Sequence, residues 1–168
     1  RSTLFPYTTL FRSPEQDTLG IGLTQNLFSW DTSLVGYFNA YHAYPMDANR
    51  SFFWIKGSDG KLMPGVKQEE MRPALLKLQE LYKSGQIDKE FVARDGNNLT
   101  EQIAQNKVGL FFGGAWDAPV HIQSLINLQP DSEWVVMKIP SIDNEPATPI
   151  LPGAVLQRIF VLKKGYPN

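Results

Sequence analysis

An apolar run followed by two glycines sets the tightest limit on how this chain can fold. Residues 108–112 form a short apolar run of the kind found in buried strands. Gly113 and Gly114 end the run and free the backbone for a sharp turn. Trp116 and Asp117 follow at the start of the next helix pattern. A Trp in this place commonly packs in a core, but the end of a strand in an open α/β sheet is also where ligands bind.

Helix and strand patterns alternate along the rest of the chain. The clearest helix is expected over residues 68–84, and Gly85 stops it. Its apolar face is expected to carry Met71, Leu75, Leu78 and Tyr82, with Leu81 beside them. A shorter helix is expected before the apolar run, with Asn98 as its cap. Its apolar positions are Leu99, Ile103 and Ala104.

The remaining elements are expected to be shorter. Asp59-Gly60 marks the turn of a β-hairpin, in which Trp54 is expected to pack. Helices are expected at residues 34–41, capped by Asp31, Thr32 or Ser33, and at residues 118–128. Strands are expected at residues 18–23, 134–137 and 155–162. This mixture of strands with longer helices indicates an α/β layer fold.

The composition excludes several classes of site. The 168 residues suffice for one domain with a sizeable core, and 42% of them are hydrophobic. The net charge of -1 and the absence of a basic stripe argue against nucleic acid as a partner. The chain has no cysteine, which excludes a disulfide, a thiolate metal site and a cysteine nucleophile. No apolar run approaches the roughly 20 residues that span a membrane.

No catalytic or metal-binding constellation is visible. His42 and His121 lack a metal-ligand companion at a usable spacing. There is no phosphate loop, no dinucleotide fingerprint and no Gly-x-Ser-x-Gly elbow. Asp88 and Glu90 are expected to cap a turn and to lie in solvent, respectively, rather than to act as an acid-base pair. We therefore expect neither a catalytic residue nor a metal or cofactor.

The first residues do not fit the fold. Residues 3–13 match, letter for letter, a common sequencing adapter translated in one reading frame, and Thr3-Leu4-Phe5 recurs as Thr9-Leu10-Phe11. We expect residues 1–13 to be an artefact of cloning or assembly that does not belong to the fold. The chain begins with Arg1 and stops at an approach to another helix, so both ends are expected to be cut.

Four motifs together resemble a known family. They are residues 18–22, the Asp59-Gly60-Lys61 turn, Leu-Tyr-Lys-x-Gly-x-Ile-Asp at residues 81–88, and Lys-Val-Gly…Gly-x-Trp at residues 107–116. In this order they resemble extracellular solute-binding proteins of family 1, the sugar-binding receptors of ABC importers, and among them the lipoprotein branch that binds oligosaccharides. The resemblance covers about residues 17–168.

The resemblance implies a periplasmic-binding-protein type II-like fold of two α/β lobes joined by a hinge. Residues 14–134 would be most of the second lobe. Residues 135–168 would cross the hinge and begin the return into a truncated first lobe. Relatives often carry a calcium-like loop before an Asp-Thr-x-Gly strand. Asp17-Thr18-Leu19-Gly20 is present, but the adapter replaces what precedes it, so no calcium site is carried over.

The resemblance also implies a carbohydrate site between the lobes. Asn26, Phe28 and Trp30 fall in the family's cleft loop, Trp116 matches the aromatic residue that stacks on sugar rings, and Asp117 would bind hydroxyl groups beside it.

The implied protein is not an enzyme. Its partners are the carbohydrate and the ABC permease subunits, and it meets the membrane only through a lipid anchor outside this sequence. It would lie on the extracellular face of the membrane or in the periplasm. The alternative is a carbohydrate-active enzyme that pairs Asp117 with a distant carboxylate. A chain that lacks most of one lobe could also bind nothing.

Overall fold

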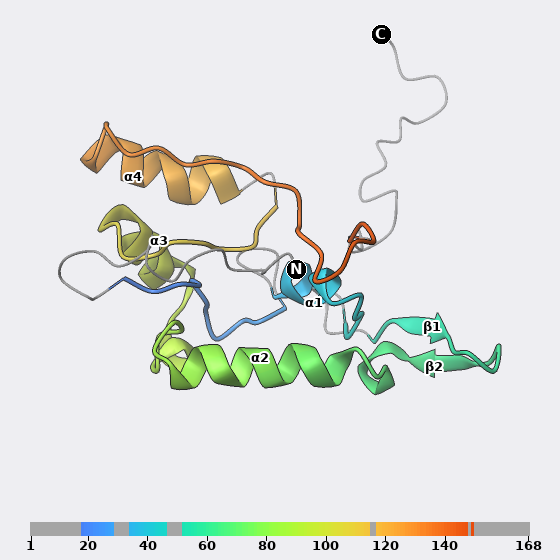
Figure 1. Ribbon diagram of the computed structural model, residues 1–168. Helices are drawn as coiled ribbons and strands as arrows, with labels where there is room; N and C mark the ends of the chain where they lie inside the picture. Colours follow the sequence, from blue (N-terminus) through green and yellow to red (C-terminus); the bar gives the residue numbers. More distant parts are fainter. Residues whose placement is uncertain (1–17, 29–33, 47–51, 115–116, 148, 150–168) are drawn as a thin grey trace, which may run out of the picture.

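A computed structural model describes residues 18–28, 34–46, 52–114, 117–147 and 149 (Figure 1). The expectations for the adapter-like residues 1–13, for the caps at residues 31–33 and for the strand at residues 155–162 lie outside these ranges. The helices are α1 (Val35–Ala40), α2 (Met71–Lys83), α3 (Gly96–Ala104) and α4 (Gln123–Leu128). Shorter helical turns are η1 (Gly65–Lys67), η2 (Phe91–Ala93) and η3 (Ala118–Ile122), and the strands are β1 (Trp54–Lys56) and β2 (Leu62–Pro64).

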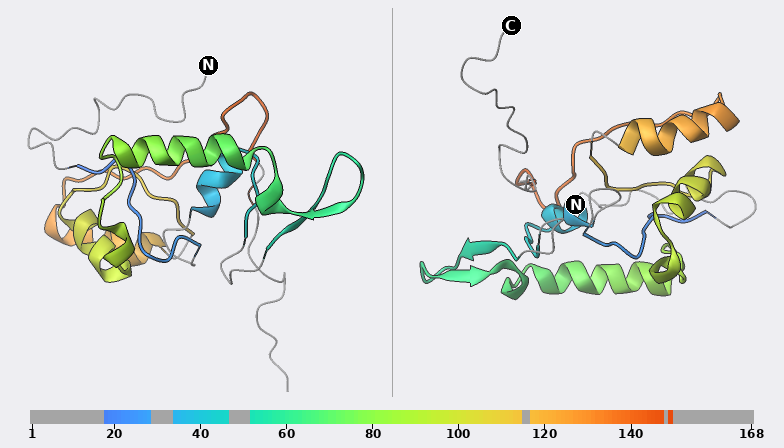
Figure 2. Two further views of the ribbon diagram at one scale, coloured as in Figure 1. Left: turned by 90° about the horizontal axis from the view of Figure 1, so that it is seen from below. Right: turned by 180° about the vertical axis from the view of Figure 1, so that it is seen from behind.

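The described elements combine helices with a small antiparallel sheet, a mixed α/β composition. β1 pairs with β2 in the register Trp54 to Pro64, which confirms the predicted hairpin. The hairpin extends beyond the N-terminal end of α2 (Figures 1 and 2). Trp54 is 64% exposed, so the expectation that it packs is wrong. Its strand lies away from the helices, and no layer of the described chain covers that face.

Extended segments between α2 and α4 form the centre of the molecule (Figure 1). Leu19 bridges Val108 and Ile21 bridges Ile87, both in parallel orientation. Residues 18–23 thus lie between the other two segments. The predicted burial of Ile21 and Val108 is confirmed, but the expected strands at residues 18–23 and 108–112 are reduced to single bridges. Three glycines in these two segments provide no side chain to hold a longer ladder.

Helix α2 buries part of the predicted apolar face. Met71 and Leu81 are buried as predicted, and Leu78 packs half-buried against the core. Leu75 and Tyr82 are exposed, so their predicted burial is wrong, and Ala74 is buried instead. The Tyr37 hydroxyl of α1 donates a 2.8 Å hydrogen bond to the Ala74 carbonyl oxygen, so α1 packs against the small residue. The helix itself, and its stop at Gly85, are confirmed.

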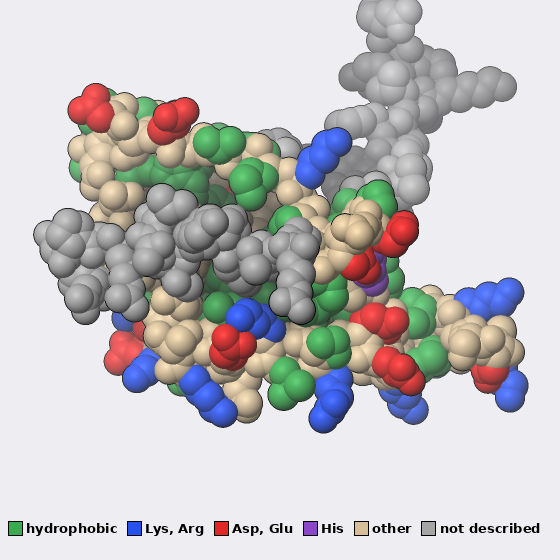
Figure 3. Space-filling model, viewed as in Figure 1, with side chains coloured by type: hydrophobic (Ala, Val, Ile, Leu, Met, Phe, Trp, Pro, Cys, Tyr) green, Lys and Arg blue, Asp and Glu red, His purple; other side chains and the backbone are tan. Residues whose placement is uncertain are grey.

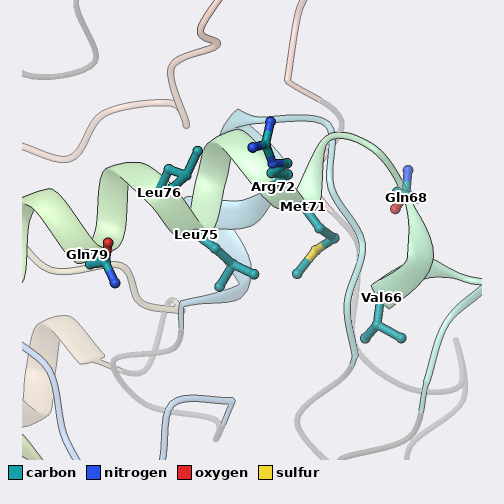
Figure 4. Close-up of a pocket in the computed structure, with 7 residues that line it drawn as sticks. All are labelled: Val66, Gln68, Met71, Arg72, Leu75, Leu76 and Gln79. Atoms are coloured by element: carbon teal, nitrogen blue, oxygen red, sulfur yellow. The ribbon is translucent and has the colours of Figure 1, made fainter.

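Helix α2 forms a shallow groove with η1. Val66, Met71, Leu75 and Leu76 line it with polar neighbours from the same two elements (Figure 4). Charged side chains of both signs lie along the lower edge of the molecule in the view of Figure 3, where Figure 1 shows α2.

The second helical layer is built from α3, η3 and α4. Leu99, Ile103 and Ala104 are buried as predicted. The N-cap of α3 is Asp95 rather than Asn98. The Asp95 side chain accepts a hydrogen bond from the Asn98 N–H at 2.9 Å, and the Asn98 side-chain oxygen accepts one from the Asp95 N–H at 3.0 Å. The predicted helix at residues 118–128 is present as η3 and α4.

The prediction of a strand at residues 134–137 is wrong. The segment pairs with no described neighbour, and Val136 is 94% exposed. Trp134 is the residue that packs, with its ring centroid 5.6 Å from that of Phe111. An apolar run alone does not form a strand when no adjacent segment offers backbone partners.

Candidate functional site

The two loops expected to bind ligand leave the centre of the molecule on the same side. The Leu19 N–H donates to the Lys107 carbonyl oxygen at 2.8 Å, and the Gly22 N–H donates to that of Leu110 at 2.9 Å. Because the two segments run parallel, their carboxyl ends lie at one edge. Residues 24–28 continue from the first segment and residues 111–114 from the second (Figure 1).

Asn26 lies exposed on the first loop. Its N–H donates to the buried Thr24 hydroxyl oxygen at 3.2 Å, and the neighbouring Gln25 N–H donates to the Arg94 carbonyl oxygen at 2.8 Å. These bonds fix the backbone of the loop and leave the Asn26 side chain at the surface.

Phe28 connects the first loop to the aromatic core. Its ring stacks on Phe38 with centroids 5.9 Å apart and an angle of 14°. Phe38 meets Tyr37 edge to face, and Tyr37 meets Phe112 at 6.2 Å. The two loops are therefore joined by four rings. Phe112 was not among the predicted site residues, although it directly precedes the glycine pair.

Tyr37 is the buried centre of this aromatic group. Burial raises the pKa of its hydroxyl, and the neighbouring Tyr41 adds to the effect. Tyr37 therefore stays neutral and donates to the Ala74 carbonyl oxygen.

Asp117 holds the glycine turn. The residue is 4% exposed, and its Oδ2 accepts the Gly114 N–H at 2.6 Å. A Cβ on Gly113 would collide with the same carboxylate, so only glycine fits there without a shift. The other carboxylate oxygen, Oδ1, lies 3.7 Å from His121 Nε2. The carboxylate thus faces the turn and the core. Its expected contact with ligand hydroxyls stays a prediction.

His121 is a buried neighbour that the sequence reasoning missed. Its Nδ1 lies 2.7 Å from the Thr100 hydroxyl oxygen, and its ring meets Phe111 edge to face. Thr100, on α3, donates in turn to the Gly96 carbonyl oxygen at 2.8 Å. The spacing of four residues between Asp117 and His121 on a helix pattern was the available signal.

Trp30 and Trp116 lie outside the described residues, so their predicted stacking on a sugar stays a prediction. Within the described ranges, no group of three or more potential ligands could hold a metal ion. A search of the same ranges for a helix long and apolar enough to cross a membrane found none.

A second polar cluster ties the turn after α2 to α3. Asp88 accepts the Glu90 N–H at 2.9 Å, Arg94 Nε at 3.0 Å and Gln102 Nε2 at 3.0 Å. Burial alone would raise the pKa of Asp88, but these hydrogen bonds outweigh burial and lower it. The Glu90 side chain is exposed. The predicted roles of Asp88 in the turn and of Glu90 in solvent are confirmed.

A third cluster joins the end of α1 to residues 141–145. His42 Nε2 lies 3.1 Å from Asp143 Oδ1 and 3.2 Å from the Ser141 hydroxyl oxygen. The Ser141 hydroxyl also donates to Asp143 at 2.7 Å. A catalytic triad needs the acid and the nucleophile on different ring nitrogens. In this cluster both partners use the same nitrogen, so the arrangement is a structural bridge.

Comparisons with known proteins give no indication of function. No family model, curated protein or solved structure matches this chain.

Proposed function

We propose that this chain is part of the solute-binding component of an ABC importer and that its solute is a carbohydrate. In this proposal residues 14–134 are most of the second lobe of a periplasmic-binding-protein type II-like fold. Residues 135–168 cross the hinge and begin the return into the first lobe. The full-length protein would be anchored by lipid on the extracellular face of the membrane, or lie in the periplasm, and would deliver its solute to the permease subunits.

One observation carries the proposal. Residues 19–22 pair in parallel with residues 107–110, which brings the loops at residues 24–28 and 111–114 to one edge. Ligands of open α/β sheets bind beyond the carboxyl ends of the strands, at such an edge.

The residue types at this edge suit a sugar. A sugar ring offers apolar C–H faces to aromatic side chains and hydroxyl groups to amides and carboxylates. Asn26 supplies an exposed amide there, and Phe28 and Phe112 supply aromatic surface. Trp30 and Trp116 follow these loops in the sequence and are the proposed stacking residues. Asp117 is the proposed acceptor of a hydroxyl group.

The test is an oligosaccharide titration of the full-length protein, prepared without residues 1–13 and followed by Trp fluorescence. Trp116→Ala is expected to abolish saturable binding. Trp54→Ala is the matched control, because Trp54 lies exposed on the hairpin and its loss is expected to leave binding unchanged. Binding that survives Trp116→Ala would remove Trp116 from the site. No binding of any sugar would reject the carbohydrate proposal, and release of shorter sugars would favour an enzyme.

A further inference from the structure

We propose that two copies of this chain pair through the outer face of α2, with the two helices side by side and antiparallel. This outer face consists of Glu69, Arg72, Leu76, Glu80 and Lys83. None of these residues is among the proposed ligand-binding residues, so the pairing does not depend on the proposed function.

The residues of the outer face lie along one side of α2. Arg72, Leu76, Glu80 and Lys83 follow one another at intervals of four, four and three residues, which places them on one face of a helix. Glu69 lies in the turn that leads into the helix, where its carbonyl oxygen accepts the Arg72 N–H at 3.1 Å. All five residues are exposed, and α2 lies along the lower edge of the molecule in Figure 1. The face is therefore open to a second chain.

The centre of the outer face is apolar. Leu76 is 54% exposed, and Leu75 beside it is 50% exposed. Both line the groove that α2 forms with η1, to which Val66 contributes a further exposed apolar side chain (Figure 4). Removal of this apolar surface from water favours association. The helix of a second copy would cover Leu76 and the groove together.

The charges along the outer face select the orientation of the second copy. From the N-terminal end they are negative at Glu69, positive at Arg72, negative at Glu80 and positive at Lys83, with Leu76 in the middle. In a parallel pair each charge would lie opposite the same residue of the other copy, and like charges repel. The pattern therefore disfavours parallel helices.

An antiparallel pair with Leu76 opposite Leu76 brings opposite charges together. Arg72 and Glu80 are each four residues from Leu76, so Arg72 of one copy lies opposite Glu80 of the other. Glu69 and Lys83 are each seven residues from Leu76 and pair in the same way. The two-fold symmetry of such a dimer makes each pair occur twice. The outer face is thus complementary in charge to a second copy of itself.

The contacts that these charged side chains make within one chain are weak competitors. Lys77 Nζ lies 2.8 Å from Glu80 Oε1, in an exposed pair three residues apart. Lys83 Nζ donates to Gln79 Oε1 at 3.3 Å. Exposed contacts of this kind contribute little to stability, so Glu80 and Lys83 can turn toward a second copy at little cost. Because one pair of helices is smaller than a standard interface, the dimer is expected to be weak.

The test is sedimentation equilibrium of the full chain at low salt, over protein concentrations from about 10 μM to about 1 mM. We expect a reversible equilibrium between monomer and dimer. Arg72→Glu and Glu80→Arg should each weaken dimerisation about tenfold, because two symmetric attractions become repulsions. Lys61→Glu is the matched control, since it reverses a charge at the hairpin turn, where the side chain is 85% exposed, and should leave the dimer unchanged.

A mixture of the two variants tests the orientation. A copy with Arg72→Glu carries only negative charge at positions 72 and 80, and a copy with Glu80→Arg carries only positive charge there. The equimolar mixture should therefore dimerise as tightly as the wild-type chain, and so should the double variant.

Three results would overturn the proposal. They are a wild-type chain that stays monomeric over the whole concentration range, a dimer that Arg72→Glu leaves unchanged, and a mixture that associates no more tightly than the single variants. Failure of sugar binding in the fluorescence titration would leave the sedimentation result intact, so the two proposals can fail separately.

Discussion

The two histidines of this chain lie in chemically similar clusters with opposite burial. Each ring is next to one hydroxyl and one aspartate. His42 contacts Ser141 and Asp143, and its side chain is 27% exposed against 49% for Asp143. His121 contacts Thr100 and Asp117, and the side chains of His121 and Asp117 are 2% and 6% exposed.

Distance alone does not decide which of these two contacts contributes more to stability. The half-buried imidazole of His42 lies 3.1 Å from its carboxylate, whereas the buried imidazole of His121 lies 3.7 Å away. An exposed pair is screened by water and salt and contributes little to stability. In a buried cluster, removal of one polar partner leaves the other without compensation from water. We therefore expect the longer contact to matter more.

The largest expected effect comes from Asp117→Ala. The change leaves the Gly114 N–H and the His121 ring without the carboxylate that both now face. We expect a loss of about 3 kcal/mol in the free energy of unfolding, measured by urea denaturation, because polar groups inside the protein lose their hydrogen-bonding partner. Asp143→Ala is the exposed counterpart and should move the urea midpoint much less. Equal losses in the two variants would mean that burial does not decide which carboxylate matters more.

Gly113→Ala should have the next largest effect. Its Cβ would collide with the Asp117 carboxylate, so the turn must open or the carboxylate must rotate away from Gly114. We expect a loss of about 1 to 3 kcal/mol by thermal or urea unfolding, as for other overpacked sites.

The neighbouring glycine provides the control for this collision. A Cβ on Gly114 would meet nothing within 4 Å. Gly114→Ala should therefore cost less than Gly113→Ala. The reverse order would show that backbone freedom, and not the Asp117 contact, fixes the turn.

The sequence predicts the features of the fold that depend on residues close together in the chain. The hairpin turn at Asp59-Gly60 and the stop of α2 at Gly85 are confirmed, and both glycines have a positive φ, of 78° and 77°. The buried positions of α3 are also confirmed, since its periodicity is complete within one helix. The mixed α/β composition follows from the same local patterns.

Contacts between distant residues could not be predicted in this way. The buried face of α2 depends on Ala74 meeting Tyr37, 37 residues away. The Thr100–His121 contact spans 21 residues, and the His42–Asp143 contact spans 101. The apolar run at residues 134–137 resembles a strand, but only the rest of the fold decides whether a partner lies beside it. Asn26 and Phe28 lie in a loop as the sequence predicts, but the stacking of Phe28 on Phe38 joins residues of two different segments and has no local sequence signal.

The smallest expected effect sharpens the description of the exposed cluster. Hydrogen bonds from Ser141 and then from His42, with the Glu145 N–H, hold the pKa of Asp143 below its ordinary value. A lowered pKa means that the cluster favours the charged carboxylate. Its stabilisation is therefore complete above the ordinary aspartate pKa and is lost as the pH falls through the lower, folded-state value.

Ser141→Ala should raise the pKa of Asp143 toward the ordinary value, measured by a ¹³C titration of the carboxyl carbon. Thr100→Val, at the buried cluster, should leave that titration unchanged. A pKa that stays low in Ser141→Ala would mean that His42 and the Glu145 N–H suffice to hold the charge. The exposed cluster would then resemble the buried one, in which a backbone N–H and an imidazole share a single carboxylate.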